Sequence, residues 1–207
     1  EWQAITYTIT YENLLGGDNH ENNLENYTVE DDEITLYPAT RDGANFIAWH
    51  INEALTSPIA SIPSGSSGNK TLYAEWTFEI YQIEYHIDAE TFNPPENPET
   101  YTVIDEITLL TPTKSDYTFI AWYLNGDKIE IIEDMTGDLD LYAEFSLTYD
   151  INYENLLDGQ NHAQNPFDYT ELSETITLHA ATREHYNFLG WYDDATPEAN
   201  KIEEIVL

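Results

Sequence analysis

Apolar and aromatic residues recur along this chain in one order, three times over. Each copy centres on an aromatic stretch, which reads YTFIAWY at Tyr117–Tyr123, NFIAWH at Asn45–His50 and YNFLGWY at Tyr186–Tyr192. When the three stretches are aligned, the apolar residues on either side fall into matching positions. The sequence is therefore a tandem array, and its function must be argued for an array.

Alternating apolar and polar residues predict two β-strands ahead of each aromatic stretch. The first strand carries Tyr-x-Ile-x-Tyr and is expected at Ile5–Tyr11, 81–85 and 149–153. The second carries Ile-Thr-Leu and is expected at Tyr27–Leu36, Tyr101–Leu109 and Tyr169–Leu178. A polar loop separates the two strands. Glu12–Asn26 and Glu154–Asp168 are near copies of this loop, and the second copy has a proline-rich segment there that forbids a helix.

The aromatic stretch places a Phe three residues before a Trp in every copy: Phe46 and Trp49, Phe119 and Trp122, Phe188 and Trp191. Positions i and i+3 of a strand face opposite sides. Either both faces of the sheet are covered, or a β-bulge re-aims one ring.

Two apolar signals follow the aromatic stretch. A pair of isoleucines three residues apart predicts one short helical turn that caps the core, at Ile59/Ile62, Ile129/Ile132 and Ile202/Ile205. A closing strand reads LYAEW at Leu72–Trp76 and LYAEF at Leu141–Phe145, with Leu, Ala and the aromatic residue on one face.

These signals divide the chain into three repeats. Residues 1–2 match the end of a preceding repeat, 3–77 form the first repeat, 78–146 the second and 147–207 the third. The third lacks its closing strand, which would leave an open sheet edge. We expect residues outside this sequence, or a strand from a neighbouring molecule, to complete it. Linkers of three or four residues predict a semi-rigid array.

Composition narrows the function classes. The net charge of −34 excludes nucleic-acid binding, which needs basic patches, and disfavours anionic lipid surfaces. The aromatic content of 14% argues against a disordered acidic chain. The absence of cysteine rules out disulfides and thiolate metal sites. No signal peptide or apolar span is visible in the sequence.

The aromatic rings could form a carbohydrate-stacking platform, but a core this small cannot spare its largest side chains, so we interpret them as core. His20 and His162 share one loop position that the second repeat lacks, which favours loop hydrogen bonding over a metal pair. The other histidines do not recur in register and are expected at the surface: His50, His86, His179 and His185.

The acidic run Glu30–Glu33 could bind Ca²⁺, but no Asp-x-Asp-x-Asp-Gly loop is present, so a solvated loop is favoured over weak, diffuse Ca²⁺ screening. Arg41, Lys114 and Arg183 occupy one repeat position and are expected to pair with carboxylates or turn carbonyls. No catalytic motif occurs. The sequence therefore predicts no catalytic, cofactor-binding or metal-binding residues, and it assigns no partner-binding ones.

The full order of motifs resembles the Listeria–Bacteroides repeat, the family of the B repeat of internalin B. The resemblance rests on Phe-x-Ala/Gly-Trp followed by Leu-Tyr-Ala-Glu-Trp/Phe, and it covers two full copies and one truncated copy. Ala44, Ala48, Ala121 and Phe145 depart from the pattern as volume changes in packing positions. The resemblance implies small β-grasp-like, ubiquitin-like domains, export and tandem arrangement on bacterial surface proteins, and no catalytic residues.

The predicted fold class is mainly β, or α+β at most. It is an array of β-grasp domains of about 70 residues, each a four-stranded sheet with one short helical turn. The predicted function is that of a non-enzymatic segment of an exported bacterial surface protein, acting as a semi-rigid stalk and in adhesion. Two alternatives stay open: a module that binds glycan or host protein through its variable loops, and an accessory region of a large secreted enzyme. Expected partners are other modules of the same polypeptide and a host or neighbouring-cell surface protein or glycan, without direct membrane insertion.

Overall fold

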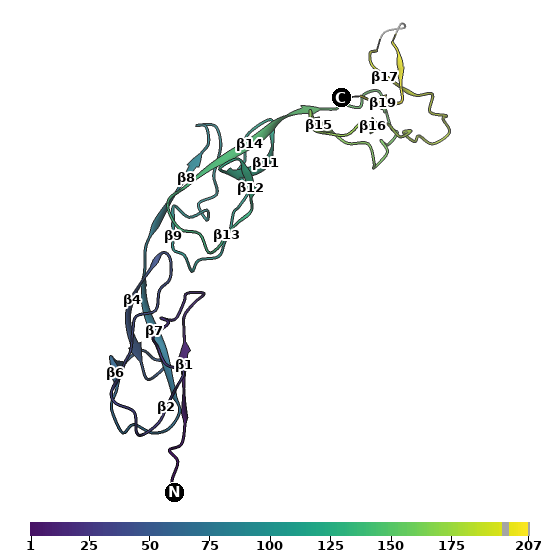
Figure 1. Cartoon of the computed structure of the whole chain (residues 1–207). Helices are drawn as coiled ribbons and strands as arrows, with labels where there is room; N and C mark the ends of the chain where they lie inside the picture. Colours follow the sequence, from purple (N-terminus) through teal and green to yellow (C-terminus); the bar gives the residue numbers. More distant parts are fainter. Residues whose placement is uncertain (196–198, 207) are drawn as a thin grey trace. The chain divides into compact units, whose positions relative to one another are not determined.

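The computed structural model describes residues 1–195 and 199–206, and within them every regular element is a β-strand. The prediction of a mainly β fold is confirmed to this extent. Figure 1 draws the chain with its strand labels. Its residues divide into two compact units. Unit 1 comprises Glu1–Glu84, Pro98–Leu109 and Glu130–Leu141, and unit 2 comprises Tyr85–Asn97, Leu110–Ile129 and Tyr142–Leu207. The boundary between the units cuts through the second repeat.

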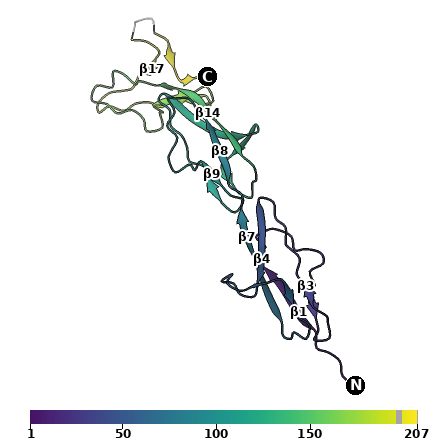
Figure 2. The ribbon, with the colours of Figure 1, turned by 90° about the vertical axis from the view of Figure 1, so that its left-hand side faces the viewer.

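The first repeat forms a five-stranded sheet in the order β2-β1-β7-β4-β5, with β3 and β6 paired separately. Its strands are β1 (Tyr7–Glu12), β2 (Asn26–Tyr27), β3 (Ile34–Thr35), β4 (Ala44–His50), β5 (Pro58–Ile59), β6 (Ser61–Ile62) and β7 (Lys70–Phe78). Strand β7 lies in the centre, parallel to β1 and antiparallel to β4, and Figures 1 and 2 both draw the three strands side by side. Short edge strands bring the sheet to five strands instead of the predicted four.

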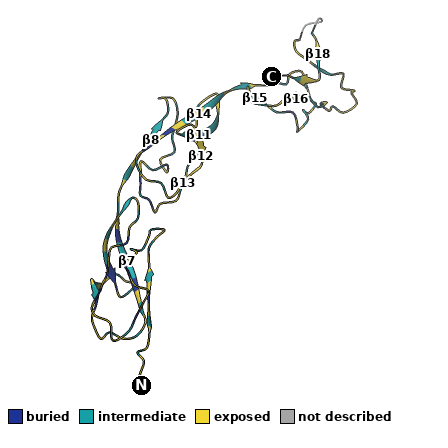
Figure 3. Cartoon of the chain, viewed as in Figure 1, coloured by how far each residue is buried: buried dark blue, intermediate teal, exposed yellow. Residues whose placement is uncertain are grey.

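The core of the first repeat is built on one face of β7. Leu72 and Ala74 are fully buried and Trp76 is 9% exposed, as the period-two pattern of LYAEW predicts (Figure 3). Ile9 from β1 and Trp49 from β4 pack into the same cluster. The closing strand is therefore the element against which both neighbouring strands are buried.

A β-bulge explains the Phe-x-x-Trp spacing. Phe46 lies opposite Trp76 and Trp49 lies opposite Ala74, and the register of β4 against β7 shifts between Phe46 and Ala48. The inserted residue, Ile47, is about half exposed. Because the extra residue restores the alternation, both rings reach the same core, with centroids 5.3 Å apart. The bulge alternative of the sequence prediction is confirmed here.

The predicted helical turn is wrong. Ile59 lies in β5 opposite Trp49, and Ile62 lies in β6 opposite Ile34. The spacing of three arises because the chain leaves one ladder and joins another with only Ala60 between them. The same exchange occurs in the other two repeats, so no helix of the β-grasp type appears in the described residues, and the β-grasp arrangement is not confirmed.

The second repeat has a sheet of the order β12-β11-β14-β8-β9, to which β15 adds by pairing with β14. Its strands are β8 (Tyr81–His86), β9 (Thr100–Tyr101), β10 (Ile107–Thr108), β11 (Tyr117–Leu124), β12 (Asp127–Ile129), β13 (Ile131–Ile132) and β14 (Leu139–Asp150). Strand β10 pairs with β13. Strand β14 is twelve residues long, and it supplies both the closing strand of the second repeat and the start of the third.

The third repeat has less regular structure. After β14 come β15 (Asp168–Thr170), β16 (Ile176–Thr177), β17 (Trp191–Tyr192), β18 (Lys201–Ile202) and β19 (Glu204–Ile205). The predicted strand at 149–153 stops at Asp150, and the aromatic stretch is a strand only at Trp191–Tyr192. In the first repeat the equivalent residues pair with β7, and the described part of the third repeat provides no such partner strand.

Candidate functional site

One asparagine in the first repeat ties the polar loop to the core tryptophan. The Asn23 side-chain amide donates to the carbonyl oxygen of Tyr37 at 2.9 Å and to Asn19 Oδ1 at 2.6 Å, and its Oδ1 accepts the N–H of Tyr37 at 2.8 Å. The indole N–H of Trp49 donates to the same Tyr37 carbonyl oxygen at 2.8 Å. Asn23 is 7% exposed, so these bonds satisfy a buried polar group. We call this arrangement the asparagine latch.

The latch recurs in both other repeats with the same donors and acceptors. Asn97 exchanges hydrogen bonds of 3.0 and 2.7 Å with the backbone of Leu110, and Trp122 donates to the Leu110 carbonyl oxygen at 3.0 Å. Asn165 exchanges bonds of 2.9 and 2.7 Å with His179, and Trp191 donates to the His179 carbonyl oxygen at 2.9 Å. Three copies of one network indicate a role in holding the repeat together.

The core tryptophans of the first two repeats are closed to ligands. Trp49 and Trp122 are each 2% exposed, and their indole N–H groups are already bonded to backbone. Tyr11 and Tyr85 pack edge-on against them, with ring centroids 5.0 and 5.2 Å away. The core interpretation is therefore confirmed for these two rings, and a carbohydrate platform on them is excluded by their burial.

The tyrosines beside these rings have perturbed acidities. Burial raises the pKa of Tyr11 to about 12, and the charge of Glu25 adds to the effect. Burial alone raises the pKa of Tyr85 to about 12. Because desolvation disfavours a phenolate, both side chains stay neutral far above ordinary pH and serve as core residues.

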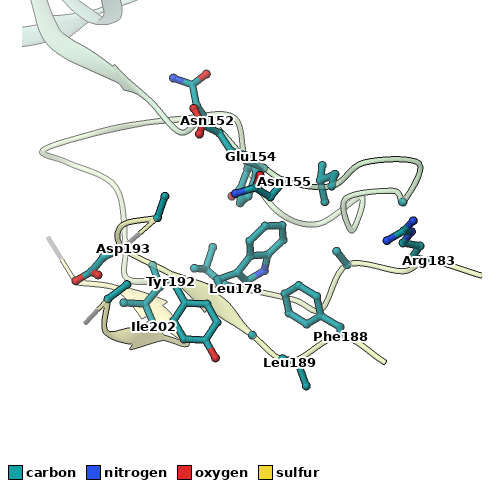
Figure 4. A pocket seen from close by; sticks show the side chains of 18 of the residues that line it. Asn152, Glu154, Asn155, Leu178, Arg183, Phe188, Leu189, Tyr192, Asp193 and Ile202 are labelled. Atoms are coloured by element: carbon teal, nitrogen blue, oxygen red, sulfur yellow. The ribbon is translucent and has the colours of Figure 1, made fainter. Parts of the chain in front are cut away.

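The third repeat contains a cavity of about 930 Å³ around Tyr153 and Trp191. Figure 4 shows it from close by, with Leu178, Phe188 and Ile202 around it. In the first repeat the counterparts of the two central rings, Tyr11 and Trp49, lie opposite Leu72 and Ala74 of β7. The cavity therefore lies where the closing strand β7 packs in the first repeat. Its lining consists of core residues that have no such strand against them.

The two loop histidines accept local hydrogen bonds. His20 Nδ1 accepts the N–H of Asn22 at 3.1 Å, and His162 Nδ1 accepts the N–H of Gln164 at 3.2 Å. Each ring stacks on the residue that its latch holds, His20 on Tyr37 at 4.8 Å and His162 on His179 at 4.7 Å. The predicted loop-bonding role is confirmed.

The prediction that His50 lies at the surface is wrong. Its side chain is 3% exposed, and Nε2 lies 2.7 Å from Glu75 Oε2 on the neighbouring strand. His50 lies opposite both Tyr73 and Pro58, so its backbone is flanked by a strand on each side. A single histidine without a counterpart in the other repeats gave no periodic signal of burial.

Two carboxylates of the acidic run, Asp31 and Glu33, accept hydrogen bonds from the first repeat itself. Asp31 accepts hydrogen bonds from the backbone N–H and the hydroxyl of Thr28, at 2.5 and 3.1 Å. Asp105 makes the same two bonds to Thr102 in the second repeat, at 2.6 and 2.8 Å. Glu33 accepts from Ser61. Repetition of one threonine–aspartate turn indicates a structural use of these carboxylates.

The recurring basic residues form ion pairs, as predicted. Lys114 contacts Asp88 at 2.5 Å, Arg183 contacts Asp158, and Arg41 contacts Asp134 at 3.1 Å. The hydrogen bond from Lys114 holds the pKa of Asp88 below its usual value, and the same bond raises the pKa of Lys114. The aspartate partner of Arg41 lies in the next repeat, whereas those of Lys114 and Arg183 lie in their own repeats.

The sequence of each repeat matches a known protein family. The model of the Listeria-Bacteroides repeat domain matches residues 7–75, 81–144 and 149–205. This chain belongs to the Listeria-Bacteroides repeat family. The resemblance seen in the sequence is thereby confirmed. Each of the three matched segments contains one copy of the aromatic stretch.

The chain is similar to part of several longer proteins. The chain is 26% identical over 200 residues to "Putative membrane protein" of Evansella cellulosilytica, a match covering 94% of this chain and 29% of that protein. It is 24% identical to "Putative Gly-rich membrane protein" of the same organism, covering 94% and 22%. It is 27% identical over 158 residues to internalin H of Listeria monocytogenes, covering 73% and 26%. The chain thus spans less than a third of the length of each relative.

No solved structure gave a significant match to these Listeria-Bacteroides repeats. The described residues include no helix that is long and apolar enough to span a lipid bilayer. The asparagine latch is the feature of the repeats that sequence reasoning missed. Its signal was present, because an asparagine stands 25 or 26 residues before the core tryptophan in every copy.

Proposed function

We propose that these Listeria-Bacteroides repeats form a non-enzymatic segment of an exported bacterial surface protein and act as a spacer between other modules. The burial of Trp49 and Trp122, with both indole N–H groups bonded internally, carries this proposal. The largest side chains and the loop amides of these repeats are buried or hydrogen-bonded within the repeat, where they stabilise its fold. That use suits a segment whose task is to stay folded between functional modules.

The relatives and the charge support the same role. The chain is similar to less than a third of internalin H and of two proteins named as membrane proteins, so we infer that it is one segment of a comparably long polypeptide. The net charge of −34 keeps neighbouring copies apart and in solution at high surface density. The proposal places the segment outside the cell, on its surface.

A surface-display experiment tests the spacer role. The chain is placed between a cell-wall anchor and a reporter binding domain on a Gram-positive cell, and access of a bulky antibody to the reporter is measured. We expect greater access than with a flexible Gly/Ser linker of equal length, and loss of that advantage when Trp122→Ala unfolds the second repeat. Equal access for the folded array and the flexible linker would contradict the proposal.

A second candidate, adhesion through the variable loops, has its own observation. Leu15 and Leu157 occupy the same loop position, are 40% and 78% exposed, and both have positive φ angles, of 54° and 56°. A leucine in that backbone region is uncommon and costs stability. Two exposed leucines held in this way suit a loop that presents an apolar tip to a protein partner.

Replacement of these leucines tests the adhesive role. Asparagine tolerates positive φ better than leucine, so Leu15→Asn with Leu157→Asn should keep or raise thermal stability. If the loops bind, the double variant should lose attachment of array-coated beads to host cells. Unchanged attachment would leave the loops without an adhesive role. Leu55→Asn is a control, because Leu55 also has a positive φ, of 52°, and lies outside these loops.

A further inference from the structure

The three basic residues at the shared repeat position all pair with an aspartate, but only Lys114 and Arg183 find it within their own repeat. Lys114 pairs with Asp88 and its Nζ lies 4.2 Å from the centre of the Tyr117 ring. Arg183 pairs with Asp158 and its guanidinium lies 3.9 Å from the centre of the Tyr186 ring. In both cases a carboxylate and an aromatic ring of the same repeat hold the cation.

The first repeat lacks both of these partners. Ala44 stands where the third repeat has Tyr186, and Gly16 stands where it has Asp158. Arg41 reaches the second repeat instead, where its guanidinium donates to the carbonyl oxygen of Val103 at 3.4 Å and to Asp134 Oδ1 at 3.1 Å. Its side chain is only 9% exposed. Such burial is unusual for an arginine and indicates a specific contact.

The backbone beside Arg41 also lies against the second repeat. A Cβ atom on Gly43 would meet Thr136 Cγ2 at 3.0 Å, and the Tyr81 hydroxyl and Val103 Cβ at 3.1 Å each. Such approaches are tighter than ordinary van der Waals contact. A side chain at Gly43 would therefore push these neighbours back, and its φ of 68° separately favours glycine.

The residue that lies under the Arg41–Gly43 turn is more buried in the second repeat than its counterpart is in the first. Val103 is 4% exposed under the Arg41–Gly43 turn, whereas its counterpart in the first repeat, Val29, is 41% exposed. The third repeat has Glu171 at this position. Burying this carboxylate under another acidic repeat would be unfavourable. Arg41, Gly43, Val103, Asp134 and Thr136 all belong to unit 1.

We propose that the Arg41–Ala44 turn is a recognition element that docks the first repeat onto a matching surface of the second, formed by Val103, Asp134 and Thr136. Loss of the in-repeat ring and carboxylate frees Arg41 for this contact, and Gly43 provides the close approach. The partner that fits is a repeat with a small apolar residue at the Val103 position and a carboxylate at the Asp134 position. The two junctions of this chain are therefore chemically different. The proposal stands independently of the spacer role.

Hydrogen exchange on the full chain tests the docking contact through amides of the repeat that is not mutated. Arg41→Met removes the charge and keeps the length of the side chain. We expect exchange in residues 99–109 and 130–138 of the second repeat to rise by roughly two- to fivefold, because the Asp134 side chain is 85% exposed and an ion pair with an exposed partner contributes at most about 1 kcal/mol. Arg183→Met is the matched control, since it removes an ion pair and a ring contact inside the third repeat. The proposal is overturned if Arg41→Met alters exchange only within residues 3–77.

A glycine pair tests the close approach separately. Gly43→Ala and Gly65→Ala place a Cβ at similar positive φ angles, of 68° and 77°, but nothing lies within 4 Å of the added atom at Gly65. Both variants carry the same backbone strain. We expect only Gly43→Ala to speed exchange in the second repeat. Equal effects of the two variants would show that strain alone is at work and would contradict the docking contact.

Discussion

The indole of Trp49 donates its hydrogen bond to the carbonyl oxygen of Tyr37, 2.8 Å away and twelve residues earlier in the chain. The same separation of twelve residues recurs between Trp122 and Leu110. Because Asn23 donates to the same carbonyl oxygen and accepts the N–H of Tyr37, the core tryptophan and the polar loop are ordered together. The stability of each repeat should therefore depend on a ring and an amide that lie far apart in sequence.

Removal of the core ring should unfold the second repeat. Trp122→Ala is expected to cost about 3–5 kcal/mol, the range for truncating a buried large aromatic side chain. Trp122→Phe keeps most of the volume and loses the indole bond, so about 1 kcal/mol is expected. Chemical denaturation followed by amide exchange within residues 78–146 measures both. A normally stable Trp122→Ala variant would overturn the core assignment and revive the ligand platform.

The asparagine latch makes a separate prediction. Asn97→Ala removes a buried side chain and leaves the N–H of Leu110 without its acceptor, so a loss of about 1–3 kcal/mol is expected. Asn93→Ala is the control, because Asn93 contributes only the acceptor at 2.6 Å from the Asn97 amide. Urea denaturation midpoints of the two variants give the comparison. Equal and small effects would show that the latch contributes little to stability.

Alkaline pH should destabilise the folded chain. Tyr11 and Tyr85 have pKa values raised from 10.0 to about 12. The stability linked to this shift is fully present below pH 10, where both states are protonated, and is lost as pH rises towards 12, because the unfolded state ionises first. Tyrosinate absorbance and circular dichroism should change together in this window. The double variant Tyr11→Phe with Tyr85→Phe should lose less stability over the same window, and an identical loss would contradict the assignment.

A closing strand should fill the cavity of the third repeat. Replacing residues 206 and 207 by a copy of residues 63–78, which holds the turn and β7, puts the strand after Ile205, the counterpart of Ile62. We expect a higher melting temperature and lower quenching of Trp191 fluorescence by acrylamide, since buried apolar area grows. The control carries the same addition with serine at the copies of Leu72 and Trp76. Equal melting temperatures for the two additions would rule out strand insertion.

Periodicity made some elements of the fold predictable. The closing strand follows from Leu72, Ala74 and Trp76, which alternate with exposed or partly exposed positions and need no knowledge of their partners. The Phe-x-x-Trp spacing allowed either two covered sheet faces or a bulge. The sequence could not decide between them, because register depends on the neighbouring strand. The isoleucine pair misled because a spacing of three fits one helical turn as well as a chain that changes ladders.

The site-level features depended on pairing across the chain. Asn23 is an ordinary loop residue by composition, and only the folded loop brings it to Tyr37. The contact of Arg41 with Asp134 joins residues 93 positions apart, and it occurs in the repeat that has Ala44 in place of the aromatic ring. Sequence reasoning noted Ala44 as a volume change and did not connect it with the cation three residues earlier.

The parallel pairing of β1 with β7 has a mechanical consequence. The chain enters the first repeat through β1 and leaves it through β7, and the two strands are hydrogen-bonded side by side from Ile9 opposite Lys70 to Glu12 opposite Tyr73. A pull on the two ends of the repeat loads these bonds in shear, so they must break together and cannot open one after another. A repeat of this topology resists tension along the polypeptide, which is the load borne by a protein held at one end and drawn at the other.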